Sequence, residues 1–480
     1  MVDLEKIKKV YVIGIKGSGV VGVVEMLKAK GIEVTGSDTA EKFFTEAILK
    51  KNQIEYFENF AVENIPENID LVMHSSVYNE NNNVEMQEVK KRELLMISYP
   101  EILAELFNVK YGIAICGTHG KTTTSAWLAN TLKELGADPE AAIGSRVTNW
   151  EGSALTGAGE IFVLEADEYQ NKLARYEPNG VILTSCDYDH PDFFPDFEAY
   201  KQTFKDFVAR IPKTGFLVVC GDATATLEVA EEATCPVFTY GFSGDCDYRI
   251  SNFQFPTLPT GRQVSNKISN PNDQNSKQMQ SFEVLFKNEK LGSFEISLFG
   301  KHNALNAAAV VAVCHRLNFS AEKIQTALKN FQGTARRFEF IGERNGAILI
   351  DDYGHHPDEI RATLAAAREL YPEKNIWAVF HPHTFTRTKA LLSEFSQSFS
   401  DADRVIVLDI YGSAREVQGG VHSKDLAELI NRYDRGKAEH IATIDEVVEF
   451  LKDKIGPEDV VIAIGAGNGW EVVSKLFKNE

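Results

Sequence analysis

A glycine-rich segment at residues 116–125, CGTHGKTTTS, combines the residue types that hold nucleotide phosphates. It follows an apolar run, YGIAIC (111–116), that predicts a buried strand, and it leads into a run that predicts a helix. In that context the backbone N–H groups would cradle phosphates, Lys121 would reach the β- and γ-phosphates, and Thr122 would ligate Mg²⁺. The usual pattern, G-x-x-x-x-G-K-[ST], places its first glycine where this chain has Ile115. A glycine-rich turn with an exposed lysine is therefore the alternative to a nucleotide site.

A second glycine-rich loop, GIKGSGVVG (14–22), lies between a predicted strand and a predicted helix. Gly17, Gly19 and Gly22 satisfy G-x-G-x-x-G, and Asp38 follows about twenty residues later, which is the dinucleotide-binding spacing. A nicotinamide-dependent dehydrogenase fits this loop, but so does any ligand with a pyrophosphate and a ribose, including a UDP-sugar. Two phosphate loops in one chain favour a ligase, because one loop can bind a nucleotide that is part of the substrate and the other can bind the nucleotide whose hydrolysis drives the reaction.

Acidic side chains follow the next two predicted strands of the central region. They lie in LEADE (164–168) and CDYDHPDFF (186–194). The carboxyl ends of strands form the ligand crevice of an open α/β sheet, and Mg²⁺ prefers carboxylate and phosphate oxygens. Glu165 is therefore a candidate metal ligand, with His190 at a second ion. A structural role is the alternative for His190.

Apolar runs that alternate with helical segments predict an α/β fold with three domains. We expect a Rossmann-like N-terminal domain (1–108), a central P-loop ATPase-like domain (109–332) and a C-terminal Rossmann-like α/β domain (333–480). The segment 256–281 is polar and rich in Asn, Gln, Pro and Ser, which predicts a flexible surface insertion; a partner-binding segment is the alternative. The main predicted strands lie at 10–15, 33–38, 71–76, 94–100, 111–116, 161–167, 180–187, 215–222, 347–354, 377–383, 404–412 and 460–470.

Composition excludes several classes of function. The chain has 480 residues, too many for one ordinary core, and its 44% hydrophobic and 25% charged content is that of a globular protein. The net charge of −19 argues against nucleic acid and anionic membranes as partners, although local basic groups still permit a phosphorylated substrate. No run of 18 apolar residues and no signal-peptide pattern occur, and the six cysteines form no C-x-x-C pair. We expect a cytoplasmic protein with reduced thiols, as a monomer or homodimer.

Five motifs, in this order along the chain, resemble those of the Mur ligases. They are GTHGKTTT (117–124), EADE (165–168), GKHNALNA (300–307), GTARRF (333–338) and DDYGHHPDEI (351–360). The resemblance covers the chain except the 256–281 segment. It implies ATP-dependent amide-bond synthesis, and it is strongest to the member that joins L-alanine to the lactyl carboxylate of UDP-N-acetylmuramate. In that reaction the carboxylate attacks the γ-phosphate, and the amino group of alanine then attacks the acyl phosphate.

The resemblance also implies roles for individual residues, with ATP as a substrate and two Mg²⁺ ions, which Mn²⁺ could replace. The catalytic residues would be Lys121, Glu165, His190 and Arg337, and the metal ligands Thr122, Glu165 and His190. ATP would contact Gly117, Thr118, Gly120, Lys121, Thr122, Thr123, Asn303, Asn306, Arg337 and Asp352; for Asn303 and Asn306 a helix-start role is the alternative. The UDP-sugar would contact Gly17, Ser18, Gly19, Asp38, Ser75 and His119. L-Alanine would contact Tyr353, His355 and Arg387.

Two residues depart from the family pattern. Lys16 stands where the family loop has glycine, and its charge would add to a pyrophosphate site. Thr384 replaces an arginine typical of the alanine-adding enzyme, which leaves Arg387 alone to bind the amino-acid carboxylate, since a hydroxyl does not replace a guanidinium.

The identity of the added group is therefore open. The segments EADEY and CDYDHPDFF lean toward the recycling ligase that attaches an intact murein tripeptide, whereas DIYGSARE (409–416) and GAGNGW (465–470) favour the alanine enzyme. A variant that adds glycine or serine is a further alternative.

Overall fold

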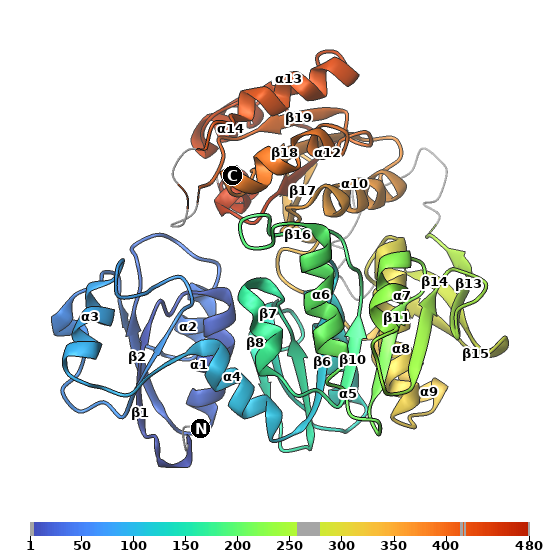
Figure 1. The fold of residues 1–480 in the computed structure, drawn as a ribbon. Helices are drawn as coiled ribbons and strands as arrows, with labels where there is room; N and C mark the ends of the chain where they lie inside the picture. The colour runs from blue at the N-terminus through green and yellow to red at the C-terminus, as the bar shows by residue number, and fades with distance from the viewer. Residues whose placement is uncertain (1–3, 257–278, 413–415, 417–418, 479–480) are drawn as a thin grey trace. The chain divides into compact units, whose positions relative to one another are not determined.

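The computed structural model describes residues 4–256, 279–412, 416 and 419–478, and it is an α/β structure with three β-sheets (Figure 1). The chain forms two compact units. Unit 1 comprises Met1–Cys186, Lys201–Tyr240 and Ala309–Ala327. Unit 2 comprises Asp187–Tyr200, Gly241–Ala308 and Leu328–Glu480.

The first sheet of unit 1 is parallel, with the strand order β3-β2-β1-β4-β5. Side chains of Tyr11, Ile13 and Val72 on one face pack against α3, and α1 lies on the opposite side of the sheet (Figure 1). Local signals fix the helix starts: the Asn83 side chain accepts the N–H groups of Glu85 and Met86 at the start of α3. The elements are η1 (Leu4–Lys6), β1 (Lys9–Ile13), α1 (Ser18–Ala29), β2 (Glu33–Ser37), α2 (Glu46–Lys51), β3 (Tyr56–Phe57), η2 (Val62–Asn64), β4 (Leu71–His74), α3 (Val84–Lys91), β5 (Met96–Ser98) and α4 (Tyr99–Asn108).

The central sheet of unit 1 follows the order β12-β11-β10-β6-β9-β7-β8. Its strands are parallel except for the β7–β8 hairpin. Strands β6 and β10 are almost wholly apolar and buried, which is typical of parallel strands covered on both faces. The elements are β6 (Tyr111–Cys116), α5 (Lys121–Glu134), β7 (Glu140–Val147), β8 (Gly152–Thr156), β9 (Ile161–Glu165), η3 (Tyr169–Arg175), β10 (Gly180–Leu183), α6 (Phe197–Val208), β11 (Phe216–Cys220), α7 (Thr224–Ala230) and β12 (Val237–Gly241).

An antiparallel meander in unit 2 consists of β13 (Tyr248–Gln254), β14 (Gln280–Phe286) and β15 (Glu289–Ile296). Helices α8 (Lys301–Arg316) and α9 (Ala321–Lys329) follow it. Residues 257–278, the bulk of the predicted insertion, lie outside the described residues, whereas 280 and 281, its last two positions, belong to β14.

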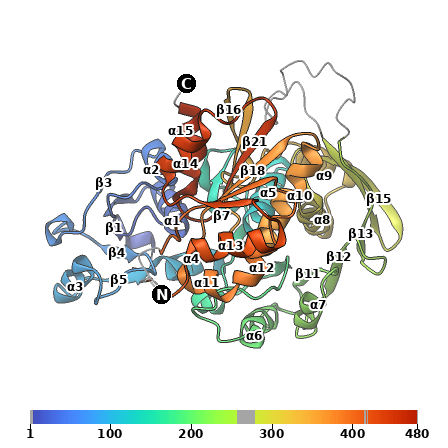
Figure 2. The ribbon, with the colours of Figure 1, turned by 90° about the horizontal axis from the view of Figure 1, so that it is seen from above.

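The third sheet lies in unit 2, with the order β16-β17-β21-β18-β19-β20, and only the β16–β17 pair is antiparallel. Successive residues of β17 enter different cores, because side chains alternate across a strand: Ile348 and Ile350 pack with α10, α12 and α13, and Leu349 packs with α14 and α15 (Figure 2). The elements are β16 (Glu339–Arg344), β17 (Ala347–Asp352), α10 (Pro357–Leu370), β18 (Asn375–Phe380), α11 (Phe385–Ala390), α12 (Leu392–Ser396), β19 (Arg404–Val407), α13 (Ser423–Tyr433), β20 (Ala438–His440), α14 (Ile444–Leu451), β21 (Asp459–Ile464), η5 (Asn468–Trp470) and α15 (Glu471–Lys478).

The predicted α/β class with three sheet-containing regions is confirmed. A strand overlaps each predicted apolar run and usually ends before the run does; β1, β18 and β21 begin one or two residues before their runs. In 94–100 the strand ends at Ser98 and α4 begins at Tyr99. The β7–β8 hairpin, the meander and β16 were not predicted. The six cysteines are all free and buried. None of the helices in the described ranges is long and apolar enough to cross a membrane.

Candidate functional site

The candidate residues fall into two groups, one in each unit. Unit 1 holds the residues predicted to contact the UDP-sugar: Gly17, Ser18, Gly19, Asp38, Ser75 and His119. It also holds the residues of the central loop predicted to contact ATP, Gly117, Thr118, Gly120, Lys121, Thr122 and Thr123, and the predicted metal ligand Glu165. Unit 2 holds the remaining candidates: His190, Asn303, Asn306, Arg337, Asp352, Tyr353, His355 and Arg387.

The segment 116–122, here called the phosphate loop, is a left-handed turn between β6 and α5. Gly117 has φ +125° and Gly120 has φ +78°, values that glycine adopts without strain. A Cβ on Gly117 would lie 2.4 Å from Thr184 Oγ1, so the loop packs directly on the end of β10. Thr184 Oγ1 donates to the carbonyl of His119 at 2.5 Å, and the N–H of His119 donates to Ser185 Oγ at 2.8 Å. These contacts fix the loop that precedes the first turn of α5.

The side chain of Lys121 is held over the phosphate loop. Its ammonium donates to the carbonyls of Gly117 (2.5 Å) and Thr118 (3.1 Å) and lies 3.1 Å from Glu168 Oε2. Burial lowers the pKa of Lys121, but the carboxylates of Glu168, Asp167 and Glu165 outweigh it and the net pKa is raised. Lys121 is therefore a fixed positive charge at the loop, which is what binding of phosphate oxygens needs.

Thr122 and Glu165 form a pair of oxygen donors beside the phosphate loop. Thr122 Oγ1 donates to Glu165 Oε1 at 2.6 Å, and the N–H of Gly144 donates to Glu165 Oε2 at 2.6 Å. A hydroxyl and a carboxylate in contact at the start of α5 offer the hard oxygen ligands that Mg²⁺ prefers, and one or two such ligands suffice when phosphate oxygens supply others. The residues present thus fit the predicted metal.

The first glycine loop, residues 14–19, also depends on close packing. Gly14 has φ +82°, and a Cβ there would lie 2.8 Å from the Cβ of Ser75, which brings the predicted sugar-nucleotide residue Ser75 against the loop. A Cβ on Gly19 would lie 2.9 Å from the Tyr99 ring, so Gly19 allows α1 to approach α4. The first N–H groups of α1 remain the predicted anion-binding feature.

The carboxylate of Asp38 organises this loop. It accepts the N–H groups of Lys16 (2.7 Å) and Thr39 (2.8 Å), and burial raises its pKa. The ammonium of Lys16 donates to the carbonyl of Thr39 (3.0 Å) and pairs with Glu46 at 2.9 Å. The expectation that Lys16 adds charge to a pyrophosphate site is therefore wrong: its side chain is fully buried and is directed into the 39–58 segment, whose carboxylates attract it.

In unit 2 the start of α8 carries a chain of amide contacts. Asn306 Nδ2 donates to Asn303 Oδ1 at 3.2 Å, and Asn303 Nδ2 donates to the Phe299 carbonyl at 2.7 Å and lies 3.1 Å from His302 Nε2. Burial, and then the charge of Arg337, lower the pKa of His302 to about 4. A neutral imidazole and two oriented amides are suited to contacts with the edge of a base. The predicted adenine-contacting role of Asn303 and Asn306 remains a prediction.

Arg337 and Asp352 lie close together near the ring of Tyr353. The guanidinium of Arg337 is 5.4 Å from that ring centroid and 3.5 Å from Glu359 Oε1. Asp352 accepts the N–H groups of Phe338 and Gly354, both at 2.8 Å, and burial raises its pKa. Asp352 thus shapes the turn that carries Arg337, and Arg337 is the more exposed of the two.

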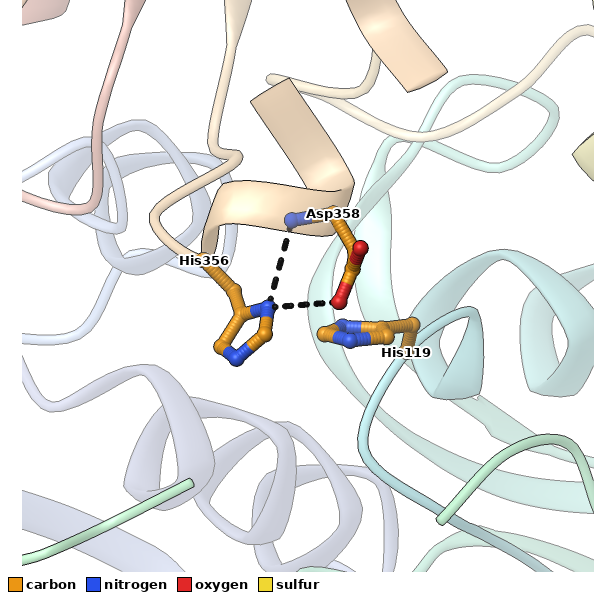
Figure 3. Close-up of side chains that lie close together, drawn as sticks. All are labelled: His119, His356 and Asp358. Carbon is orange, nitrogen blue, oxygen red and sulfur yellow. Dashed lines mark hydrogen bonds and ion pairs between the residues drawn. The ribbon is translucent and has the colours of Figure 1, made fainter. Parts of the chain in front are cut away.

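Two histidines precede α10. His356 caps this helix, because the N–H of Asp358 donates to His356 Nδ1 at 3.3 Å (Figure 3). On its other side His356 Nε2–H donates to the Tyr188 carbonyl at 3.3 Å. His355 Nδ1–H donates to the Tyr353 carbonyl at 3.2 Å, and burial lowers its pKa to about 4. The His355 imidazole is therefore neutral near pH 7. His356 caps α10, whereas the predicted role of His355 in the amino-acid group remains a prediction.

Arg387 forms a buried, bidentate ion pair with Asp189. Arg387 Nε donates to Asp189 Oδ1 at 2.9 Å and Nη2 donates to Oδ2 at 3.3 Å, and each side chain is about 5% exposed. Burial raises the pKa of Asp189, but Arg387 and the nearby His190 and His355 outweigh this and hold it well below its usual range. The N–H of His190 donates to the same carboxylate at 2.7 Å. His190 thus lies in unit 2 beside this pair, and its predicted role at a second Mg²⁺ stays a prediction.

Among the residues that contact the candidates, four titratable side chains were not predicted to act there. Glu168 pairs with Lys121, His302 contacts Asn303, Glu359 contacts Arg337, and Asp189 pairs with Arg387. Each lies inside or beside a motif that the sequence had already marked. The motifs locate such residues, but only the folded chain shows which charges meet.

Comparisons with known proteins identify the family. Three family models match in chain order: the Mur ligase family catalytic domain at residues 9–111, the Mur ligase middle domain at 115–314 and the Mur ligase glutamate ligase domain at 336–467. The chain is 36% identical over 469 residues to a UDP-N-acetylmuramate–L-alanine ligase of Desulfitobacterium hafniense, covering 97% of this chain and 99% of that protein. It is 37% identical over 473 residues to the enzyme of the same name from Geotalea uraniireducens, covering 98% of each.

Solved structures share the fold. A UDP-N-acetylmuramate–alanine ligase from Thermotoga maritima matches with a TM-score of 0.79 at 22% identity, over 98% of both chains. A murein peptide ligase from Psychrobacter arcticus matches with a TM-score of 0.72 at 22% identity, over 98% of both chains. The nucleotide-site motifs, the three-sheet α/β architecture and these matches define a ligase. The chain belongs to the Mur ligase family.

Proposed function

We propose that this protein joins L-alanine to the lactyl carboxylate of UDP-N-acetylmuramate at the expense of ATP, through an acyl-phosphate intermediate, in the synthesis of peptidoglycan precursors. The near full-length similarity to enzymes named UDP-N-acetylmuramate–L-alanine ligase carries the proposal. The position of Lys121, Thr122 and Glu165 around one loop supports it.

The chemistry follows from the weakness of a carboxylate as an electrophile. One carboxylate oxygen attacks the γ-phosphorus, the bond to the bridging oxygen of ATP breaks, and ADP leaves. The alanine nitrogen, after loss of a proton, attacks the acyl carbon, and phosphate leaves with the former carboxylate oxygen. Two anions meet in the first step, so fixed cations and oriented N–H groups are needed where charge develops. Lys121 and the N–H groups of the phosphate loop supply them in this proposal.

We assign Mg²⁺ to Thr122 and Glu165, with His190 at a second ion. Bound Mg²⁺ would neutralise phosphate charge. Chelation of divalent ions with EDTA should stop phosphate release, and added Mg²⁺ or Mn²⁺ should restore it. Phosphate release that persists in excess EDTA would contradict the assignment.

Each of the three predicted domains is assigned one substrate. Residues 1–108 would bind the UDP-sugar, 109–332 ATP, and 333–480 the amino acid, which is supported by family matches that begin and end close to these limits. The roles proposed for Asn303, Asn306, Arg337, Asp352, Tyr353 and His355 are supported by their grouping in unit 2. Its substrates would place the protein in the cytoplasm, as a monomer or homodimer.

A screen of amino substrates tests the proposed function. Phosphate release is measured with ATP, Mg²⁺ and UDP-N-acetylmuramate, together with L-alanine, glycine, L-serine or the murein tripeptide, and the product mass is determined. We expect the highest kcat/KM with L-alanine. The second candidate function is that of the recycling ligase, which is favoured by threonine, rather than arginine, at position 384. Turnover with the tripeptide alone would identify that function instead.

A further inference from the structure

The guanidinium of Arg387 has two edges that can each receive a carboxylate, and the structure shows one of them in use. Asp189 accepts Nε–H and one Nη2–H, which is the side-on edge. The end-on edge carries N–H groups on Nη1 and Nη2, and Nη1 makes a long contact, 3.4 Å, with His383 Nδ1. A planar guanidinium fixed on one edge presents the other in a defined direction.

The start of α11 holds the backbone that carries this arginine. Thr384, a β-branched residue, has φ +67°, a strained conformation that persists only where surrounding contacts fix it. Its N–H donates to the Tyr411 carbonyl at 2.9 Å, and its carbonyl accepts the Thr388 hydroxyl at 2.7 Å. The backbone contacts of Thr384 thus hold the start of the helix that carries Arg387, and its side chain adds no positive charge there.

We propose that Asp189 is a positioning residue for the amino-acid substrate: it fixes Arg387 so that the end-on edge of the guanidinium receives the substrate carboxylate. The inference rests on the proposed function and extends it to a residue that touches Arg387 rather than the substrate. With a neutral hydroxyl at Thr384, Arg387 is the single guanidinium of the proposed clamp. Its orientation then decides amino-acid affinity, and Asp189 sets that orientation.

Substitution of Asp189 by asparagine tests the inference. An amide has one acceptor oxygen, and its NH2 group faces the other guanidinium N–H, so the two parallel bonds to Nε–H and Nη2–H are lost and with them the fixed direction of the guanidinium. We expect D189N to raise KM for L-alanine at least tenfold, with kcat within about threefold and KM for ATP and for UDP-N-acetylmuramate within about twofold of the wild type. Asp403→Asn, which removes an exposed carboxylate that pairs with Arg368 elsewhere in unit 2, is the matched control and should leave all constants within about twofold.

A second guanidinium distinguishes positioning from a structural role. In the double variant D189N/T384R we expect KM for L-alanine to fall at least threefold relative to D189N, because the new arginine binds the carboxylate independently. If D189N does not fold, Asp189→Glu decides: it keeps the charge but displaces the guanidinium by one methylene, and we expect KM for L-alanine to rise at least threefold with kcat retained.

The outcomes separate the inference from the proposed function. A wild-type protein that does not use L-alanine overturns the proposed function. A wild-type protein that does, with an unchanged alanine KM in D189N, overturns only the role of Asp189. An equal rise in KM for all three substrates, or no recovery in D189N/T384R, also overturns it, since a structural defect would act in that way.

Discussion

Replacement of Lys121 by methionine should impair both the stability and the activity of the protein, for separable reasons. The ammonium lies 3.1 Å from Glu168 Oε2, and Glu168 is 1% exposed while Lys121 is 15% exposed. Coulomb's law at this distance, with an effective dielectric constant of about 20, gives an attraction of about 5 kcal/mol, part of which offsets burial of the two charges. Removing one partner of such a pair costs about 3 kcal/mol in the free energy of unfolding.

The effect on activity has another origin. Loss of one fixed donor at a site of developing charge costs about a hundredfold to a thousandfold in kcat. The double variant Lys121→Met/Glu168→Gln removes both charges of the pair. It should therefore recover most of the lost stability, while phosphate release stays about a hundredfold or more below the wild-type rate.

Urea unfolding and phosphate release, measured on both variants, check these expectations. Lys201→Met is the matched control, because Lys201 is a buried lysine of unit 1 that pairs with Glu228 at 2.6 Å and lies outside the phosphate loop. It should lose stability and keep turnover. Recovery of turnover together with stability in Lys121→Met/Glu168→Gln would refute a catalytic role for Lys121.

Further predictions concern the two glycine loops and the dependence of stability on pH. Gly117→Ala should lower the free energy of unfolding by about 2 kcal/mol or more and lower phosphate release at least tenfold, because the new Cβ would lie 2.4 Å from Thr184 Oγ1. Gly136→Ala is its control, since Gly136 has φ +81° and no atom lies within 4 Å of the new Cβ. It should lower the free energy of unfolding by about 1 kcal/mol and leave phosphate release unchanged. Lys16→Met should lower the unfolding temperature but leave KM for UDP-N-acetylmuramate within about threefold, since the ammonium pairs with the 39–58 segment; a tenfold rise in that KM would refute this. Stability should fall as the pH is lowered from about 6.5 to about 4, because three histidines with folded pKa values of about 4 bind protons first in the unfolded chain. These are His302, His355 and His381. Burial also raises the pKa values of Asp38, Asp351 (to about 6) and Asp352, and these carboxyls oppose the trend. His381→Asn should therefore lose less stability than the wild type between about pH 6.5 and 4; equal losses in urea unfolding would contradict the histidine contribution.

The features predicted from the sequence were those that depend on residues close together in the chain. Apolar runs marked the strands, and the glycines at Gly117 and Gly120 marked a turn that needs positive φ. The meander was not predicted, because its strands flank the polar 257–278 segment and alternate weakly with polar residues.

Ion pairs between residues far apart in the chain could not be predicted from the sequence. Asp189 and Arg387 are separated by 198 residues, and Lys16 meets Glu46 and Glu58 only in the folded chain. Each of these charges has several possible partners in the sequence, and only the folded backbone selects one. Motifs therefore located the candidate groups, while the direction of each side chain within them came from the structure.

The transfer of oxygen from the carboxylate to phosphate tests the central claim most directly. UDP-N-acetylmuramate labelled with ¹⁸O in both lactyl carboxylate oxygens is incubated with ATP, Mg²⁺, L-alanine and the protein, and the released phosphate is analysed by mass spectrometry. An acyl-phosphate route predicts one ¹⁸O atom in each phosphate, released only when L-alanine is present. Unlabelled phosphate alongside the alanyl product would contradict it, because the carboxylate would then not have been the group that attacked ATP.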